Sequence, residues 1–269
     1  VAIESVLTNL MINFDIIMIG YFLQSSSVGF YRSIQPLSRG LPIFLSAFIF
    51  LYMPMATDYY KDGELSELNN IYLSTTKWAT FLTYPLALLF IFNSKAVVAT
   101  FFGDQYLPAA SALSILSLGM FLRVVVGPNG ATIKAINRTK VDLLASIAGV
   151  LSNIVLNFIL IPRLGFSGAA VATAVSYLIF NVVDSTVVYL STGIHPVSVS
   201  TFKQLLPSGI AAWYLSTMNF SFVGIYRIAL LGLILLFIHL VSYIITGSID
   251  SNDDILIDII EDNLGVDLS

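Results

Sequence analysis

The chain has 269 residues, of which 57% are hydrophobic and 10% are charged, and its mean hydropathy is +0.88. Soluble domains contain about 45–50% apolar and about 25% charged residues, so this composition excludes a soluble globular domain and predicts an all-α integral membrane protein. The chain has no cysteine, which excludes disulfides and thiolate chemistry, and its formal charge of −4 reflects an acidic end that holds seven of the sixteen acidic residues.

Eight apolar segments are long enough to cross the roughly 30 Å hydrocarbon core as helices of about 20 residues. In chain order they cover about residues 6–23, 34–56, 71–92, 108–133, 143–161, 168–190, 205–222 and 226–246. The first six predict a helical lobe over residues 1–190. The last two predict an additional helix pair over residues 191–247, and residues 248–269 predict an acidic, solvent-exposed tail.

The connections between these segments also carry information. The charged stretch 58–70 must lie in water, and the run 95–102, followed by the turn residues 103–106, is too short to span and predicts an interfacial turn. Gly127 and Pro128 must interrupt the fourth segment. The densest basic loop contains Lys134, Arg138 and Lys140, which favours its face as the cytoplasmic one.

Ionisable residues inside the apolar segments are the candidate site residues. A charge near the bilayer centre costs at least about 2.5–3.5 kcal/mol, so Asp15, Arg39, Arg123 and Asp184 must face protein or a wet cavity. Arg32 lies seven residues before Arg39 on the same helical face, and the two could present a cationic stripe to an anionic ligand such as a diphosphate. In the alternative, Arg32 reaches the membrane interface and Arg39 pairs with Asp15 as a structural contact.

The polar and small residues of the fifth and sixth segments predict helix packing. Asn153 and Asn157 lie one turn apart and more often join helices than bind a head group. The small residues from Gly168 to Ala174 predict a close helix contact.

The sequence contains no enzyme or metal-binding motif. His195 and His239 are far apart, and there is no glycine-rich phosphate loop. We therefore predict no catalytic residue, no cofactor, no metal site and no nucleic-acid partner.

One run closely resembles a family signature. Residues 157–173, NFILIPRLGFSGAAVAT, follow the pattern N-x-x-L-I-P-x-x-G-x-x-G-A-A-x-A-T of the polysaccharide biosynthesis flippases of the MOP (MATE-like) superfamily. Two further pieces follow the order of that family: Asp15–Phe22 leading to Val28–Tyr31, and Gly103–Ala110. The resemblance covers residues 5–190 with motifs, and the last two segments only by hydrophobicity.

This resemblance implies a fold, an activity and partners. The chain looks like spans seven to fourteen of a fourteen-helix protein. An N-terminal six-helix lobe would then be missing, and it or a second copy would be the partner. By analogy, the full transporter moves an anionic lipid-linked oligosaccharide across the cytoplasmic membrane by alternating access between two lobes. It would contact membrane lipids and perform no covalent chemistry.

Three alternatives remain open from the sequence. A MATE-type cation-coupled drug antiporter would use Asp15 and Asp184, although it gives no role to Arg39 and Arg123. A membrane glycosyltransferase or ligase would need large catalytic loops, and no loop before the tail exceeds about fifteen residues. The chain could also be an inactive remnant of a truncated gene.

Overall fold

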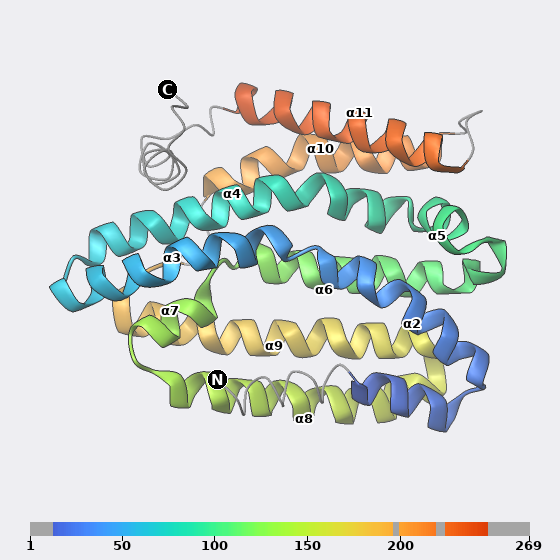
Figure 1. Cartoon of the computed structure of the whole chain (residues 1–269), viewed down its shortest axis with the longest axis horizontal. Coiled ribbons are helices and arrows are strands. Elements are labelled where there is room, and N and C mark those ends of the chain that lie inside the picture. Colours follow the sequence, from blue (N-terminus) through green and yellow to red (C-terminus); the bar gives the residue numbers. More distant parts are fainter. Residues whose placement is uncertain (1–12, 196–198, 219–223, 247–269) are drawn as a thin grey trace.

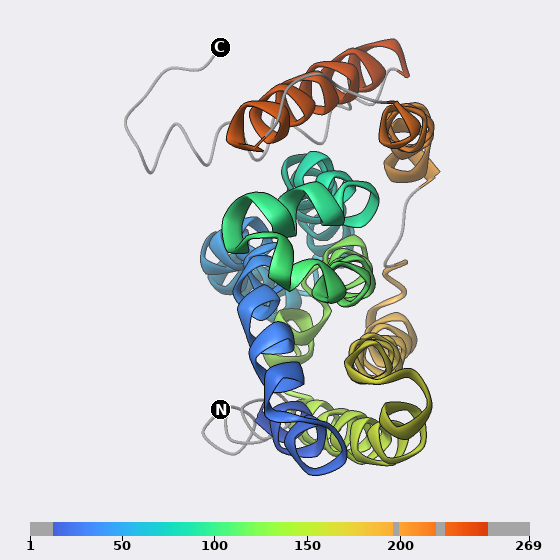
Figure 2. The ribbon, with the colours of Figure 1, turned by 90° about the vertical axis from the view of Figure 1, so that its right-hand side faces the viewer.

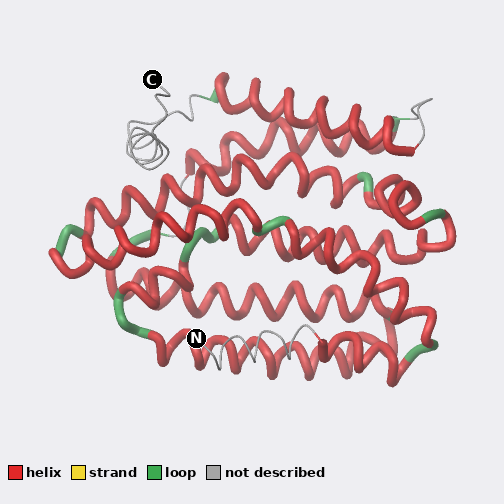
Figure 3. Tube along the Cα trace, viewed as in Figure 1, coloured by secondary structure: helices red, strands yellow, loops and turns green. Residues whose placement is uncertain are grey.

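The computed structural model describes residues 13–195, 199–218 and 224–246, and all regular structure in these ranges is helical (Figure 3). The predicted fold class, an all-α membrane protein, is confirmed. The acidic tail, the start of the first predicted span and the end of the seventh lie outside the described residues.

The helices follow the predicted segments in chain order. The first is Asn13–Phe22. It is followed by α2 (Ser25–Gly40), α3 (Ile43–Asp62), α4 (Leu65–Phe92), α5 (Ser94–Phe102), the 3-10 helix η1 (Asp104–Ala109), α6 (Ala110–Val125), α7 (Asn129–Ala135), α8 (Thr139–Leu164), α9 (Phe166–Thr192), α10 (Val199–Thr217) and α11 (Gly224–Ile245).

The long helices pack side by side as a bundle (Figures 1 and 2). Helix α8 packs along α9, α9 along α6, α6 along α4, and α3 along α4, while α10 and α11 pack on each other and on α4. The α3–α4 and α7–α8 connections lie at one end of the bundle, and the α8–α9 connection and α5 lie at the other (Figure 1). This alternation is the one that the predicted order of spans requires.

The number of spans differs from the predicted eight. By length and composition, five described helices can cross a membrane, or up to six if α4 and α5 are counted as one bent span. The predicted segment 34–56 is divided at Leu41 and Pro42 between α2 and α3, because Pro42 has no N–H to continue the helix. The 19-residue α10 is not among the five, and only residues 13–22 of the first helix are described.

The predicted interruptions of the chain are confirmed. Helix α5 is bent by 85° from α4, as expected for a short segment that turns at the interface. Helix α6 ends at Val125 and α7 begins at Asn129, so Gly127 and Pro128 separate them. The chain also turns at Gly165, where α8 ends and α9 begins.

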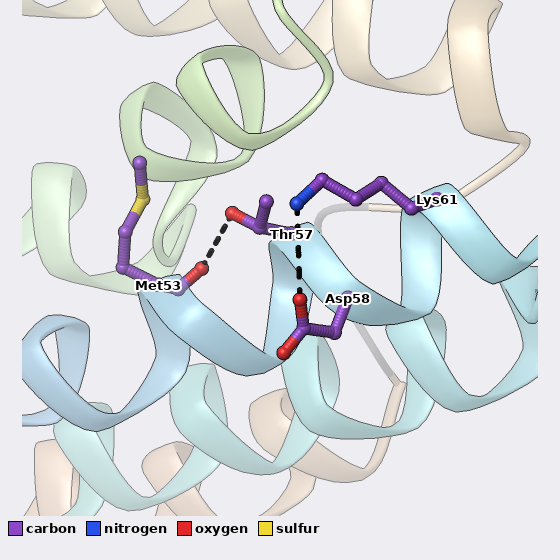
Figure 4. A network of polar contacts seen from close by, with 4 residues as sticks. All are labelled: Met53, Thr57, Asp58 and Lys61. Atoms are coloured by element: carbon purple, nitrogen blue, oxygen red, sulfur yellow. Dashed lines mark hydrogen bonds and ion pairs between the residues drawn. The ribbon is translucent and has the colours of Figure 1, made fainter.

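The α3–α4 end of the bundle is polar, as the charged stretch 58–70 predicts, although most of that stretch is helical. Figure 4 shows the last turns of α3, where Lys61 and Asp58 form an ion pair at 4.0 Å with side chains that are 68% and 73% exposed. An exposed pair of this kind contributes little stability, so its value here is to mark the part of α3 that lies in water. Thr57 satisfies its hydroxyl within the helix by donating to the Met53 carbonyl at 2.9 Å.

The small residues of α9 form a helix contact, as predicted. A Cβ on Gly119 of α6 would lie 2.7 Å from the Cβ of Ala174, and a Cβ on Gly168 would overlap the Leu160 carbonyl of α8. Glycine therefore permits both close approaches.

Candidate substrate-binding site

Asp15 lies inside the bundle, as predicted for a carboxylate in an apolar span. Its side chain is 1% exposed and accepts hydrogen bonds from Tyr31 Oη at 3.0 Å, Asn157 Nδ2 at 2.8 Å and Thr173 Oγ1 at 2.5 Å. These donors come from α2, α8 and α9. The carboxylate thus joins four helices through neutral donors.

The asparagines of α8 extend this network. Asn153 Nδ2 donates to Thr173 Oγ1 at 3.3 Å, and Asn157 Nδ2 donates to Asn153 Oδ1 at 3.0 Å. Both amides join helices, as the sequence predicts. Among the described residues, the buried Oδ1 of Asn157 has no hydrogen-bond partner, so one oxygen beside Asp15 is open to a further donor or a cation.

Arg39 and Asp15 line the same small pocket but form no ion pair in the described part of the chain. The Asp15 pocket is lined by Asp15, Tyr31, Gln35, Ser38, Arg39, Leu116, Met120, Thr173 and Tyr177. Arg39 is half-buried in the last turn of α2. The structural pairing that the sequence left open is therefore not formed. The arginine side chain faces the pocket without a bound carboxylate.

Arg32 does not continue this cationic surface into the pocket. Its side chain is exposed, and the residues that line the Asp15 pocket do not include it. The two arginines of the predicted cationic stripe therefore do not share this pocket, since Arg32 is exposed and Arg39 is half-buried. The placement of Arg32 fits the interfacial alternative better.

Arg123 lies at a second cavity, which forms where α6 and α7 are interrupted. This break cavity has a volume of about 190 Å³ and is lined by Leu45, Ile49, Met53, Arg123, Gly127, Pro128, Asn129, Gly130, Ala131, Lys134, Asp142, Phe180 and Asn181. The Arg123 guanidinium stacks over the Tyr177 ring at 5.5 Å from its centroid. Because Tyr177 also lines the Asp15 pocket, this contact links the two sites.

The interruption is held in place by side chains from neighbouring helices. Tyr72 Oη of α4 donates to the Val126 carbonyl, and Asn129 Nδ2 donates to Asn181 Oδ1 of α9 at 3.1 Å. A carbonyl freed from a helix inside a membrane must find such a donor. The cavity thus has a fixed wall and is not a gap left by a frayed helix.

Asp184 is fully buried in α9, behind the break. A Cβ on Gly130 would lie 3.8 Å from its Oδ2, whereas neither cavity includes Asp184 among its lining residues. The predicted candidates therefore fall into two neighbouring groups, with Asp15 and Arg39 in one, Arg123 in the other and Asp184 behind it. Arg32 belongs to neither.

Sequence reasoning missed several polar residues of the lobe. Lys134 and Asp142 line the break cavity as an ion pair at 3.6 Å, whereas from the sequence Lys134 was identified only as part of the basic loop and Asp142 was not singled out. Lys77 is 5% exposed in α4 and stacks over the Tyr243 ring at 5.9 Å. Its position within the predicted span 71–92 was the signal that could have identified it.

Comparison with known proteins supports the resemblance seen in the sequence. Residues 1–111 match the family described as polysaccharide biosynthesis protein. The chain is 27% identical over 178 residues to the probable low-salt glycan biosynthesis flippase Agl15 of Haloferax volcanii, covering 66% of this chain and 37% of the relative. It is 30% identical over 111 residues to a probable multidrug resistance protein NorM of Bacillus thuringiensis, covering 39% and 24%.

A solved structure shows the same fold. The lipid II flippase MurJ in an inward closed conformation superposes with a TM-score of 0.68 and 19% identity, over 94% of this chain and 53% of the MurJ chain. The chain thus spans about a third of the flippase relative and half of the solved structure. Together with the signature run, these matches show that the chain is similar to polysaccharide biosynthesis proteins and to a relative named as a glycan biosynthesis flippase, in agreement with the resemblance seen in its sequence.

Proposed function

We propose that the chain takes part in moving a lipid-linked oligosaccharide or polysaccharide precursor across the cytoplasmic membrane by alternating access. The observation that carries this proposal is the half-buried Arg39, which faces the Asp15 pocket without an ion-pair partner among the described residues. A guanidinium in an apolar lobe is costly unless an anion or water reaches it. The relatives named as a glycan biosynthesis flippase and a lipid II flippase suggest that this anion is the head group of a lipid-linked glycan.

The mechanism follows from electrostatics and requires no bond to be made or broken. The polar, anionic head of such a precursor cannot cross about 30 Å of hydrocarbon unaided. Arg39 offers a fixed fork of donors that matches phosphate oxygens, and the surrounding helices exclude lipid from it. We accordingly propose a carrier and not an enzyme. A second lobe, either an N-terminal one or another copy, would complete the cavity.

Complementation of glycan export tests this function. In a strain that lacks its own flippase, Arg39→Ala should abolish most surface-glycan export, and Arg39→Lys should retain part of it because the charge is kept and the fork is lost. Arg163→Ala is the matched control, since Arg163 is exposed at the end of α8. Protein in the membrane is measured by blot. Full export by a normally expressed Arg39→Ala variant would remove the ligand role.

A cation-coupled antiporter is the second candidate, because a buried carboxylate is a proton or cation site by default. Asp15 and the open Oδ1 of Asn157 are the oxygens that would serve it, and a relative named as a multidrug resistance protein supports it. If Asp15→Asn abolishes export while Arg39→Ala does not, coupling by this carboxylate becomes the better description. Loss of drug efflux, measured in the same variants, would then identify the substrate.

A further inference from the structure

We propose that the break cavity is a second substrate station, which holds one sugar bearing a phosphate group, with the phosphate on Arg123. This inference rests on the proposed function and adds a subsite to it. The cavity opens where α6 and α7 are interrupted, and its Arg123 stacks on Tyr177, which lines the Asp15 pocket. Arg123 is therefore a second guanidinium close to the pocket that Arg39 lines.

The charge of the cavity favours an anion. Lys134 and Asp142 form an ion pair at 3.6 Å with side chains that are 30% and 4% exposed, so their charges largely offset each other. Arg123 forms no ion pair within the described ranges, and its guanidinium lies over the face of Tyr177. Stacking holds the guanidinium plane and leaves its N–H donors available to oxygens. The carboxylate of Asp184 does not line the cavity, although a Cβ on Gly130 would lie 3.8 Å from its Oδ2 and 4.0 Å from Asp142 Oδ1.

The size of the cavity limits the ligand. Its volume of about 190 Å³ far exceeds the roughly 10–15 Å³ that admits one water, and it is below the roughly 300–1,000 Å³ of a pocket for a drug-sized molecule. One phosphorylated monosaccharide is the scale that fits, and an oligosaccharide does not.

The other lining residues match a sugar better than a bare phosphate. Asp142 and Lys134 supply a hydrogen-bond acceptor and donors for ring hydroxyls, and Phe180 supplies an apolar surface for a sugar face. These groups come from α7, α8 and α9; the hydrogen bond between Asn129 and Asn181 joins α7 to α9, and the Lys134–Asp142 ion pair joins α7 to α8. A preorganised cavity of this kind limits the ordering cost of binding.

Binding of small probes to the intact protein in lipid nanodiscs tests the site. Saturation-transfer NMR is recorded with glucose 1-phosphate, with inorganic phosphate and with glucose. We expect glucose 1-phosphate to bind, and we expect Arg123→Gln to weaken it by about ten- to a hundredfold. Asp142→Asn should weaken it less, and the exposed Arg163→Gln should not change it. Arg123→Lys, which keeps the charge, should retain partial binding if Arg123→Gln fails to fold.

Each outcome decides the proposal. Unchanged binding in Arg123→Gln overturns the site, as does equal binding of inorganic phosphate with no effect of Asp142→Asn. If the Arg123→Gln variant both exports glycan and binds glucose 1-phosphate as the parent does, the second binding site is refuted and the proposed flippase function stands. Conversely, Arg123-dependent binding in an intact protein that exports no glycan keeps the site and refutes the proposed function.

Discussion

At the scale of single residues, the Asp15 network shows how a carboxylate is kept inside an apolar lobe. Three donors from three other helices satisfy it, and none of them is charged. Each donor removed would leave part of a buried charge unsatisfied, which costs about 1–3 kcal/mol or more. The network therefore holds four helices together, and we expect the stability of the lobe to depend on each of its hydrogen bonds.

The Thr173 hydroxyl provides a test of that sensitivity. We expect Thr173→Val to destabilise the protein by about 1–3 kcal/mol, because the isosteric side chain keeps the packing and removes the 2.5 Å hydrogen bond to Asp15. Thr173→Ser, which keeps the hydroxyl, should stay close to the parent. Thermal unfolding in detergent, followed by size-exclusion chromatography, measures both. Equal melting of the valine and parent proteins would show that Asp15 does not depend on this donor.

The sequence predicts the burial of Asp15 and Arg39 but not their partners. Their burial follows from the free-energy cost of placing a charge in hydrocarbon, and this cost can be recognised from the apolar residues on either side in the sequence. The partners of Asp15 are 16, 142 and 158 residues away, and only the packing of α8 on α9 brings Asn157 and Thr173 together. Pairing of Asp15 with Arg39 was plausible on charge alone, but three neutral donors occupy the carboxylate instead.

At the scale of helices, the breaks between helices shape the lobe as much as the membrane spans do, and the two were not equally easy to predict from the sequence. The apolar runs predict the helices well because length and hydropathy suffice for that. Leu41 and Pro42 were missed as a division because they lie within a continuous apolar run, although Pro42 was a visible signal. Gly127 and Pro128 were identified, and the structure adds that Tyr72 donates to the freed Val126 carbonyl and that Asn181 holds the Asn129 side chain.

Gly127 is the residue on which the α6–α7 break depends. Its φ is +73°, and a Cβ there would overlap Thr76 Oγ1 and lie 3.1 Å from Thr76 Cβ. We expect Gly127→Ala to lower both membrane expression and melting temperature, and Thr76→Ala to restore them only in part, since the backbone strain remains. Gly29→Ala is the control, because nothing lies within 4 Å of its Cβ position. Normal expression and melting of Gly127→Ala would contradict the strained geometry.

At the scale of the whole molecule, the arrangement of the connections fixes an orientation. The elements that carry Lys61, Lys134 and Arg138 lie at one end of the bundle, and α5 with Lys95 lies at the other (Figure 1). The dense basic loop predicts that its end faces the cytoplasm.

The absence of cysteine from the sequence makes this orientation directly measurable. We expect Lys95→Cys to react with a membrane-impermeant maleimide on intact cells, and Lys140→Cys to react only after permeabilisation. Both side chains are exposed, so accessibility is not limited by packing. The parent protein is the unlabelled control. The reverse pattern of labelling would place the basic loop outside.

The 85° bend after α4 has a consequence for how the lobe sits in different lipids. At 1.5 Å per residue, the 28 residues of α4 extend about 42 Å, which equals the bilayer with its head groups. Because Phe101 of α5 is exposed, we expect this helix to lie along the membrane surface and to set the depth of the lobe. If the lobe tilts during the proposed alternating access, the tilt would press α5 into the acyl chains or lift it from them. The transport rate should therefore depend on bilayer thickness, and it should change with the acyl-chain length of the surrounding lipids.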